Sequence, residues 1–310
     1  MTTDPITTDE LIEARMDETG LTREQLLLVV AKSALVRHLA TGPDKDRFVL
    51  KGGTLLAHAY KSPRQSVRDA DYTYIKPALP TVDDLIEMLR VSGTNGFHLD
   101  PAEARWTTGA DIYVAKGMKF SIEDITVVPR SRGRGRGNAL DMSVSVRSGE
   151  CLDGPIPLIY TDAMLAGEHR FSVMGLSLEE LAAEKMLGWA SKDQSRHFID
   201  LAYIARDYRE VLDGEKAATL IRSKFEHEKS SGRYRNIRTV SQLADAFSAP
   251  ARIKLIRDSW KDDLGTQILF LPDEADRAEG SLTDFANVER YVNEVWGPIL
   301  RAASQHQHRR

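Results

Sequence analysis

The stretch from Phe48 to Ile75, FVLKGGTLLAHAYKSPRQSVRDADYTYI, decides the fold. Its short apolar run at 48–50 predicts a strand, and the glycine pair Gly52-Gly53 ends that strand. An apolar-rich segment over 54–60 predicts a helix, and residues 69–75, which follow a polar loop, predict a second strand. The stretch therefore predicts a strand, a glycine turn, a helix and a strand in close succession.

The parts of the chain on either side of this stretch differ in their hydrophobic periodicity. Thr22 and Gln25 have the spacing of a capping box, which predicts that a long helix covers 26–39. Residues 97–160 are rich in Val, Ile, Thr and Tyr and lack helical periodicity, so they predict several strands. From Leu178 to the end, apolar residues recur every three or four positions, which predicts helices.

These patterns predict an α+β or α/β fold with two lobes. We expect residues 1–175 to form an α/β lobe with a mixed sheet and N-terminal helices, and residues 176–310 to form a helical lobe. A chain of 310 residues lies near the upper end of what one hydrophobic core supports, which agrees with two lobes.

The composition excludes several classes of protein. Hydrophobic residues make up 42% and charged residues 28%, which excludes a largely disordered chain. The net charge of −4 is too close to neutral for a protein that coats nucleic acid by bulk charge. The longest apolar run, 26–31, is too short to span a bilayer, and the acidic N-terminus lacks the pattern of a signal peptide. A single cysteine, Cys151, excludes an intramolecular disulfide framework, so we expect a cytoplasmic protein.

The first candidate for chemistry is the turn Lys51-Gly52-Gly53-Thr54. Two glycines let the backbone approach a phosphate closely, and the start of a helix offers free N–H groups and the positive end of its dipole. Thr54 can add a hydroxyl donor. The alternative is a tight turn that binds nothing, in which Thr54 only caps the helix.

The second candidate is the pair Asp69 and Asp71. Because side chains alternate along a strand, both carboxylates point to one face, about 6–7 Å apart, and repel each other unless a cation lies between them. Hard oxygen ligands in this arrangement suit Mg²⁺, which also binds substrate phosphates. The alternative is a pair of solvated aspartates at a strand edge. The neighbours Tyr72 and Tyr74 favour a strand inside a sheet instead.

A third carboxylate is expected on a later strand, at 119–128. Divalent-metal phosphoryl chemistry commonly needs another acidic group, either as a metal ligand or to take the proton from the attacking hydroxyl. Glu123 and Asp124 point to opposite faces of this strand, so only one of them can serve. The alternation leaves the choice open, because apolar residues occupy both faces.

The three motifs together resemble a known family. The segments VLKGGT (Val49–Thr54) and RDADY (Arg68–Tyr72), with SIEDIT (Ser121–Thr126) as a weaker match, resemble the nucleotidyltransferase superfamily typified by DNA polymerase β. Within it, the chain resembles the AbiEii/MenT-type toxins of bacterial toxin–antitoxin and phage-resistance modules. The resemblance covers residues 45–210. It implies a mixed-sheet nucleotidyltransferase lobe, and the position after Ile122 favours Glu123 as the third carboxylate.

Two charged residues in the expected helical lobe strengthen this resemblance. Lys185 lies on an apolar helical face and Asp200 in an almost unbroken apolar run, and such charges cost free energy unless they are paired or in use. The alternative is that Lys185 extends to solvent and Asp200 pairs with Arg196. The resemblance implies that both residues line the nucleotide pocket. It also implies an arginine before the two aspartates, and here either Arg64 or Arg68 could meet the phosphates.

A further feature follows the expected third-carboxylate strand. Arg130, Arg132, Arg134 and Arg136 are separated by Ser or Gly and could form a flexible cationic loop that binds a phosphate backbone. The alternative is a solvated loop whose charge keeps it soluble.

The leading hypothesis is an enzyme that transfers a nucleoside monophosphate from an NTP and releases pyrophosphate. Asp69, Asp71 and Glu123 would hold Mg²⁺, and the expected nucleotide-binding residues are Lys51, Gly52, Gly53, Thr54, Arg68, Lys185 and Asp200. The resemblance implies an RNA acceptor, the tRNA 3′ end, a block of translation, and a cognate antitoxin. The alternatives are a nucleotidyltransferase that acts on a small molecule or a protein, and a catalytically silent NTP-binding regulator.

Overall fold

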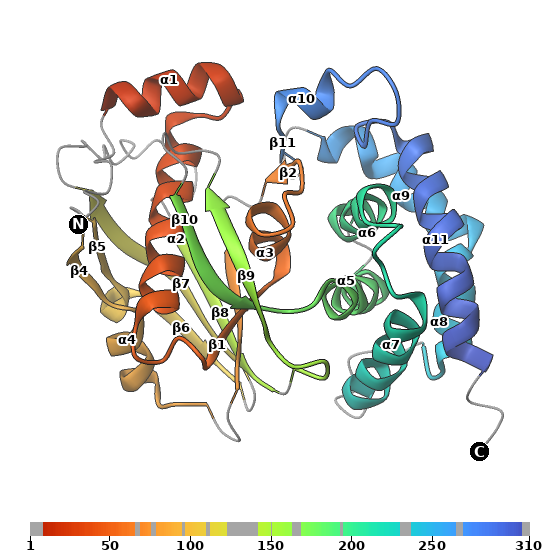
Figure 1. Ribbon diagram of the computed structural model, residues 1–310, viewed down its shortest axis with the longest axis horizontal. Helices are drawn as coiled ribbons and strands as arrows, with labels where there is room; N and C mark the ends of the chain where they lie inside the picture. Colours follow the sequence, from red (N-terminus) through yellow and green to blue (C-terminus); the bar gives the residue numbers. More distant parts are fainter. Residues whose placement is uncertain are drawn as a thin grey trace. The chain divides into compact units, whose positions relative to one another are not determined.

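We describe the fold from a computed structural model of the chain (Figure 1). The structure describes residues 9–65, 69–75, 79–94, 97–109, 112–122, 142–149, 151–162, 169–192, 195–229, 237–264 and 269–305. The chain divides into two compact units, each considered by itself below. Unit 1 comprises Met1–Lys61, Ser66–Cys151 and Pro155–Gly175, and unit 2 comprises Ser62–Gln65, Leu152–Gly154 and Leu176–Arg310.

Unit 1 is built on a mixed sheet whose described strands number nine. They are β1 (Phe48–Lys51), β3 (Asp69–Tyr74), β4 (Val91–Thr94), β5 (Phe97–Asp100), β6 (Arg105–Thr108), β7 (Ile112–Ile122), β8 (Met142–Ser148), β9 (Ile156–Asp162) and β10 (His169–Gly175). The order is β4-β5-β7-β8-β3-β1-β10-β9, and β6 pairs with β7. Most neighbours are antiparallel, but β3 pairs with β8 and β1 with β10 in parallel, so the sheet is mixed.

The helices of unit 1 are α1 (Asp9–Thr19), α2 (Arg23–Thr41), α3 (Gly52–His58) and α4 (Val82–Leu89), and a short 3₁₀ turn covers Pro101–Glu103. The predicted capping box of α2 is confirmed, because the Thr22 hydroxyl accepts from the Gln25 amide and the Gln25 side chain accepts from the Thr22 amide. Eleven of its residues are buried, which agrees with its apolar sequence and its contacts with β3, β8 and β10.

Unit 2 is mainly helical. Its elements are β2 (Arg64–Gln65), α5 (Leu178–Lys192), α6 (Ser195–Asp207), α7 (Gly214–Lys229), α8 (Val240–Ser248), α9 (Pro250–Asp263), β11 (Leu269–Phe270), α10 (Pro272–Ala275) and α11 (Phe285–Gln305). The strands β2 and β11 form a separate two-stranded sheet. In α11 the buried residues Val288, Val292 and Trp296 recur every four positions, and the Trp296 indole donates to the Leu201 carbonyl of α6 at 2.8 Å.

The predicted fold class is confirmed, while element bounds differ by a few residues. The helix expected over 54–60 begins at Gly52 and ends at His58, because its first turn uses the two glycines. Unit 2 contains 62–65 and 152–154 in addition to the residues from Leu176 onward, so a single boundary after residue 175 does not describe it. That the two units are separate domains stays a prediction. Among the described helices, none is long and apolar enough to cross a membrane.

Candidate active site

The glycine turn joins β1 to α3 and is shaped by one carboxylate. Gly52 has φ +70°, a conformation that L side chains rarely adopt. A Cβ atom at this position would lie 2.5 Å from Oδ2 of Asp71. Gly52 is therefore required twice, for its backbone conformation and for the space beside the Asp71 carboxylate.

Asp69 and Asp71 lie on one face of β3, as the alternation predicts. Asp69 is exposed and Asp71 half-buried, whereas Ala70 and Tyr72 between and after them are buried on the other face. Burial raises the pKa of the Tyr72 phenol, and the charge of Asp71 raises it further, so the phenol stays neutral. The alternation therefore separates a polar face with two carboxylates from an apolar face.

The neighbouring strand β8 supplies two hydroxyl groups to these carboxylates. The parallel register pairs Asp69 with Ser143 and Asp71 with Ser145. The Ser143 hydroxyl donates to Asp69 Oδ1, and the Ser145 hydroxyl donates to Asp71 Oδ1. Each hydrogen bond holds one carboxylate oxygen, so the two serines orient the pair.

The Thr54 side chain links the start of α3 to β3 by a hydrogen bond. Its hydroxyl donates to the backbone carbonyl of Asp69 at 2.6 Å, and its side chain is 1% exposed. The expected hydroxyl donor to a ligand is thus committed to the main chain of β3, because α3 packs against β3. Lys51, at the end of β1, is paired in register with Asp71 and is half-buried.

A second charged cluster lies entirely within unit 2. Arg64 of β2 donates to both oxygens of Asp200, from Nε to Oδ1 at 2.6 Å and from Nη2 to Oδ2 at 2.9 Å. Lys185 Nζ lies 2.6 Å from Asp200 Oδ2. The side chain of Asp200 is completely buried, and those of Arg64 and Lys185 are 6% and 7% exposed. Asp200 therefore pairs with Arg64 and Lys185, two partners that the alternative of a pair with Arg196 did not include.

The electrostatics of this cluster favour the ionised form of Asp200. Burial alone raises the pKa of Asp200, but the charges of Arg64 and Lys185 outweigh it and hold the pKa well below its ordinary value. Burial, together with the charge of Lys185, lowers the pKa of His197 to about 3, so this ring is neutral at pH 7. Two cations and one anion leave the cluster of Arg64, Lys185 and Asp200 with one excess positive charge, which suits an anionic ligand.

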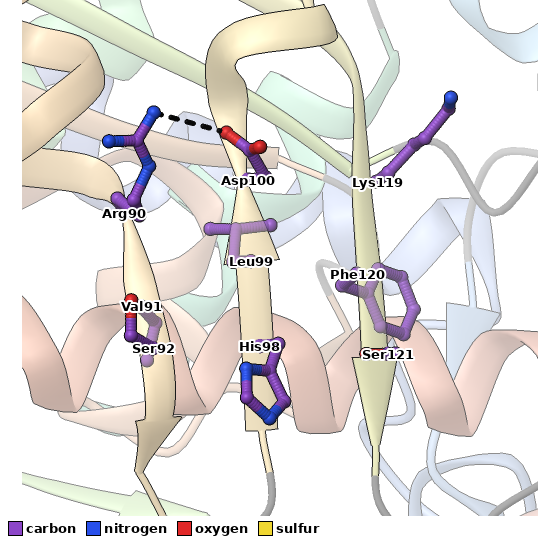
Figure 2. Close-up of a pocket in the computed structure, with 9 residues that line it drawn as sticks. All are labelled: Arg90, Val91, Ser92, His98, Leu99, Asp100, Lys119, Phe120 and Ser121. Atoms are coloured by element: carbon purple, nitrogen blue, oxygen red, sulfur yellow. Dashed lines mark hydrogen bonds and ion pairs between the residues drawn. The ribbon is translucent and has the colours of Figure 1, made fainter.

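A surface hollow of ≈ 350 Å³ lies elsewhere in unit 1, over β4, β5 and β7. Figure 2 shows Arg90, the residue between α4 and β4, directed toward Asp100 of β5, with Lys119 of β7 beside them. Arg90 pairs with Asp100 at 3.5 Å and also with Glu87, and Lys119 pairs with Glu103. The cations of the hollow are thus already neutralised, and we assign it no part in the chemistry.

Comparison with protein families decides the identity of the chain. The model of the family "Nucleotidyl transferase AbiEii toxin, Type IV TA system" matches residues 33–290, which is more than half of the chain. The chain belongs to the AbiEii family. It is a nucleotidyltransferase, the toxin of a type IV toxin–antitoxin system, so its substrate is an NTP and its partner an antitoxin.

Among solved structures, MenT4 has a fold similar to that of this chain. MenT4, a nucleotidyltransferase toxin from Mycobacterium tuberculosis H37Rv, is 17% identical, with a TM-score of 0.54 over 96% of this chain and 95% of that one. JHP933 from Helicobacter pylori is 15% identical, with a TM-score of 0.47 over 93% of this chain and 97% of that one. The search of curated proteins gave no match.

Several residues predicted for the AbiEii site lie outside the described residues. They are Glu123 and Asp124, Arg68, and Arg130, Arg132, Arg134 and Arg136. Their roles stay predictions. Within the part of the chain that the structure describes, no group of three or more His, Cys, Asp or Glu side chains could hold a metal ion, so Asp69 and Asp71 stand as a pair.

The sequence did not indicate Ser143 and Ser145 as partners of the aspartates. Their alternation with Met142, Val144 and Val146 is visible in the sequence and predicts a polar strand face. Only the parallel pairing of β3 with β8 brings that face beside Asp69 and Asp71. Arg64 was considered for the phosphates, but its link to Asp200 depends on the pairing of β2 with β11 in unit 2.

Proposed function

We propose that this toxin transfers a nucleoside monophosphate from an NTP to an RNA acceptor, the tRNA 3′ end, and releases pyrophosphate. The observation that carries the proposal is the pair Asp69 and Asp71 on one face of β3, next to the glycine turn and held by Ser143 and Ser145. The product would be a tRNA that cannot take part in translation. A cytoplasmic location, where NTP and tRNA occur together, is part of this proposal.

The donor set of Asp69 and Asp71 fits a divalent cation such as Mg²⁺. Both donors are hard carboxylate oxygens, Asp69 is exposed and Asp71 is half-buried. Mg²⁺ is usually held by one or two carboxylates together with substrate phosphates and water, so two protein carboxylates suffice. A bound Mg²⁺ would neutralise charge on the triphosphate and on the pyrophosphate that leaves.

The chain's own residues would position the reactants. The backbone amides of Gly53 and Thr54 would donate to phosphate oxygens, and Lys51, beside Asp71, would add positive charge. The acceptor hydroxyl would attack the α-phosphorus, where one P–O bond forms while the bond to the β-phosphate breaks. Glu123 would accept the hydroxyl proton, or act as a further metal ligand. Catalysis would then rest mainly on positioning and charge stabilisation.

Lys185 and Asp200 would act on the triphosphate through charge. The buried ion pair between Lys185 and Asp200 supports the hypothesis that Asp200 orients Lys185. Arg64, held by both oxygens of Asp200, is a further cation of the same cluster and is preferred over Arg68 as a phosphate-binding residue. The excess positive charge of this cluster supports a role toward an anion.

The test is to incubate the purified protein with total RNA and each α-³²P-labelled NTP, with Mg²⁺ and with EDTA, and to identify the labelled RNA. We expect label on tRNA with Mg²⁺ and none with EDTA, and none with the Asp71→Asn variant. Label on a different RNA would change the acceptor. Label on no RNA with any NTP would contradict the proposal and favour a small-molecule or protein acceptor.

A further inference from the structure

The polar face of the sheet continues from Asp69 across three more strands. The registers pair Asp69 with Ser143, Ser143 with Lys116, and Lys116 with Arg105, so these four residues form one row across β3, β8, β7 and β6. Paired residues of neighbouring strands point to the same side of a sheet. The side chains of Lys116 and Arg105 therefore emerge on the face that carries the Asp69 carboxylate.

The adjacent row supports this orientation. Ala70, Val144, Ala115 and Trp106 pair in the same way one position along the strands. Ala70, Val144 and Ala115 are at most 1% exposed, so this row faces the core of unit 1. Because the side-chain period of a strand is two residues, the row with Lys116 and Arg105 faces away from that core. Both Lys116 and Arg105 are exposed.

A third cation lies on the same face of β8. Arg147 follows Ser143 and Ser145 at a spacing of two residues and is half-buried. We call Arg105, Lys116 and Arg147 the basic strip; it places one cation on each of β6, β7 and β8. Figure 1 shows these three strands in one part of the sheet.

The basic strip differs from the other cations of this sheet region. Lys119 is paired with Glu103, and Arg90 is paired with both Asp100 and Glu87. By contrast, none of the ion pairs found among the described residues includes a member of the basic strip. Like charges on one face repel each other, and an anionic ligand relieves that repulsion.

The dimensions of the strip fit a polyanion rather than a single phosphate. Neighbouring strands lie about 4.8 Å apart, so the row from Asp69 to Arg105 extends over about 14 Å. A triphosphate held at Asp69, Asp71 and the glycine turn would not reach Arg105. A nucleic-acid strand carries one phosphate per nucleotide and can contact several cations in turn.

We propose that the basic strip binds the phosphate backbone of the RNA acceptor and leads its 3′ end from β6 toward Asp69. This inference rests on the proposed function, because it assumes that the acceptor is RNA. It assigns the acceptor to the β6–β7–β8 side of the two aspartates, whereas the glycine turn lies on the β1 side. The RNA then approaches the carboxylates of β3 from the β8 side, and the NTP approaches them from the β1 side.

The test compares two triple variants of the full chain. The strip variant carries Arg105→Gln, Lys116→Gln and Arg147→Gln. The control variant carries Lys45→Gln, Lys254→Gln and Arg301→Gln, which removes the same charge from exposed positions in the turn before β1, in α9 and in α11. Deacylated total tRNA is the probe. The measurements are the KM for tRNA in the labelling assay, the salt dependence of tRNA binding, the affinity for NTP with Mg²⁺, and the melting temperature.

We expect the strip variant to raise the KM for tRNA at least about tenfold, with NTP affinity and melting temperature unchanged. Each lost phosphate contact should make the slope of log affinity against log salt shallower by roughly 0.7, hence by about 2 for three contacts. The control variant should behave like the wild type.

Four outcomes would overturn the inference. They are an unchanged KM for tRNA, an equal effect of the control variant, a loss of NTP affinity in place of tRNA affinity, and a loss of neutralisation by the antitoxin with tRNA use intact. The last would assign the strip to a protein partner. If the wild type labels no RNA with any NTP, the proposed function itself fails. If the wild type labels tRNA and the strip variant does so with unchanged KM, only this inference fails.

Discussion

The aspartates of the two units lie in opposite environments. Asp69 and Asp71 of unit 1 are exposed and half-buried, and the groups that bind their Oδ1 atoms are the neutral hydroxyls of Ser143 and Ser145. Asp200 of unit 2 is completely buried and is bound by two cations. All three are aspartates next to apolar residues in the sequence, so their environments differ because of the fold alone.

These different environments indicate what each carboxylate can do. A carboxylate that is open to solvent can offer its oxygens to a metal ion. A buried carboxylate with two cationic partners has its charge neutralised, and it serves to hold those cations in place. The five predictions that follow test this division of roles.

Asp71→Asn should have the largest effect. We expect transfer to fall by roughly 10³-fold or more, because several kcal/mol of metal-mediated charge stabilisation are lost. Stability should hold or rise, since one of two like charges is removed. Transfer of labelled NMP and thermal unfolding check the two parts. Asp69→Asn should likewise lose transfer and keep its stability. Near wild-type transfer in either variant would show that the metal assignment is wrong.

Asp200→Asn should act on stability first. It leaves Arg64 and Lys185 buried beside each other without their counter-ion, which typically costs about 3–5 kcal/mol. Chemical denaturation measures the loss. Adding Lys185→Met to Asp200→Asn removes one of the two cations and should restore part of the stability. If Asp200→Asn is as stable as the wild type, Arg64 and Lys185 are hydrated and do not depend on Asp200 as counter-ion.

Glu123→Gln should reduce transfer by roughly 10²-fold, the usual contribution of a positioned general base, and Asp124→Asn should have much less effect. Steady-state labelling rates measure both. The reverse ranking would assign the third carboxylate to Asp124. If neither variant is impaired, the third carboxylate lies elsewhere, and Asp141, two residues before Ser143 in the sequence, is the next residue to test.

Lys185→Ala should reduce transfer by roughly 10- to 100-fold through weaker charge stabilisation of the triphosphate. Its cost in stability should be smaller than that of the core truncation Leu181→Ala, which is typically about 2–5 kcal/mol, because Asp200 keeps Arg64 as partner. Lys224→Ala is the matched control, since Lys224 is also largely buried and paired, with Glu180 and Glu184. Equal transfer in both variants would leave Lys185 a structural residue.

Ser145→Ala should have the smallest effect. Loss of a group that orients a metal ligand typically reduces metal affinity about tenfold or somewhat more, so the Mg²⁺ concentration for half-maximal transfer should rise by about that factor. Ser148→Ala, on the same strand but facing the other way, should leave it unchanged. An unchanged Mg²⁺ requirement for Ser145→Ala would show that the hydroxyl does not orient Asp71.

The sequence predicted the strand, glycine turn, helix and strand that carry the candidate site, and the structure confirms these elements. Gly52, Asp69 and Asp71 were recognised because glycine conformations and strand alternation act between near neighbours in the chain. The capping box of Thr22 and Gln25 was predicted for the same reason and is confirmed. Ser145 was missed because its hydrogen bond to Asp71 joins positions 74 residues apart.

The sequence by itself determined the order of strand, glycine turn, helix and carboxylate strand, and it determined the family that the chain resembles. The tertiary structure alone decided that Ser143 and Ser145 flank the aspartates, that Asp200 holds both Arg64 and Lys185, and that Lys116 and Arg105 share a row with Asp69. The physical reason is that propensity and periodicity act over a few residues. Strand register and the pairing of buried charges depend instead on which distant segments pack together, and that is set by the burial of the whole core.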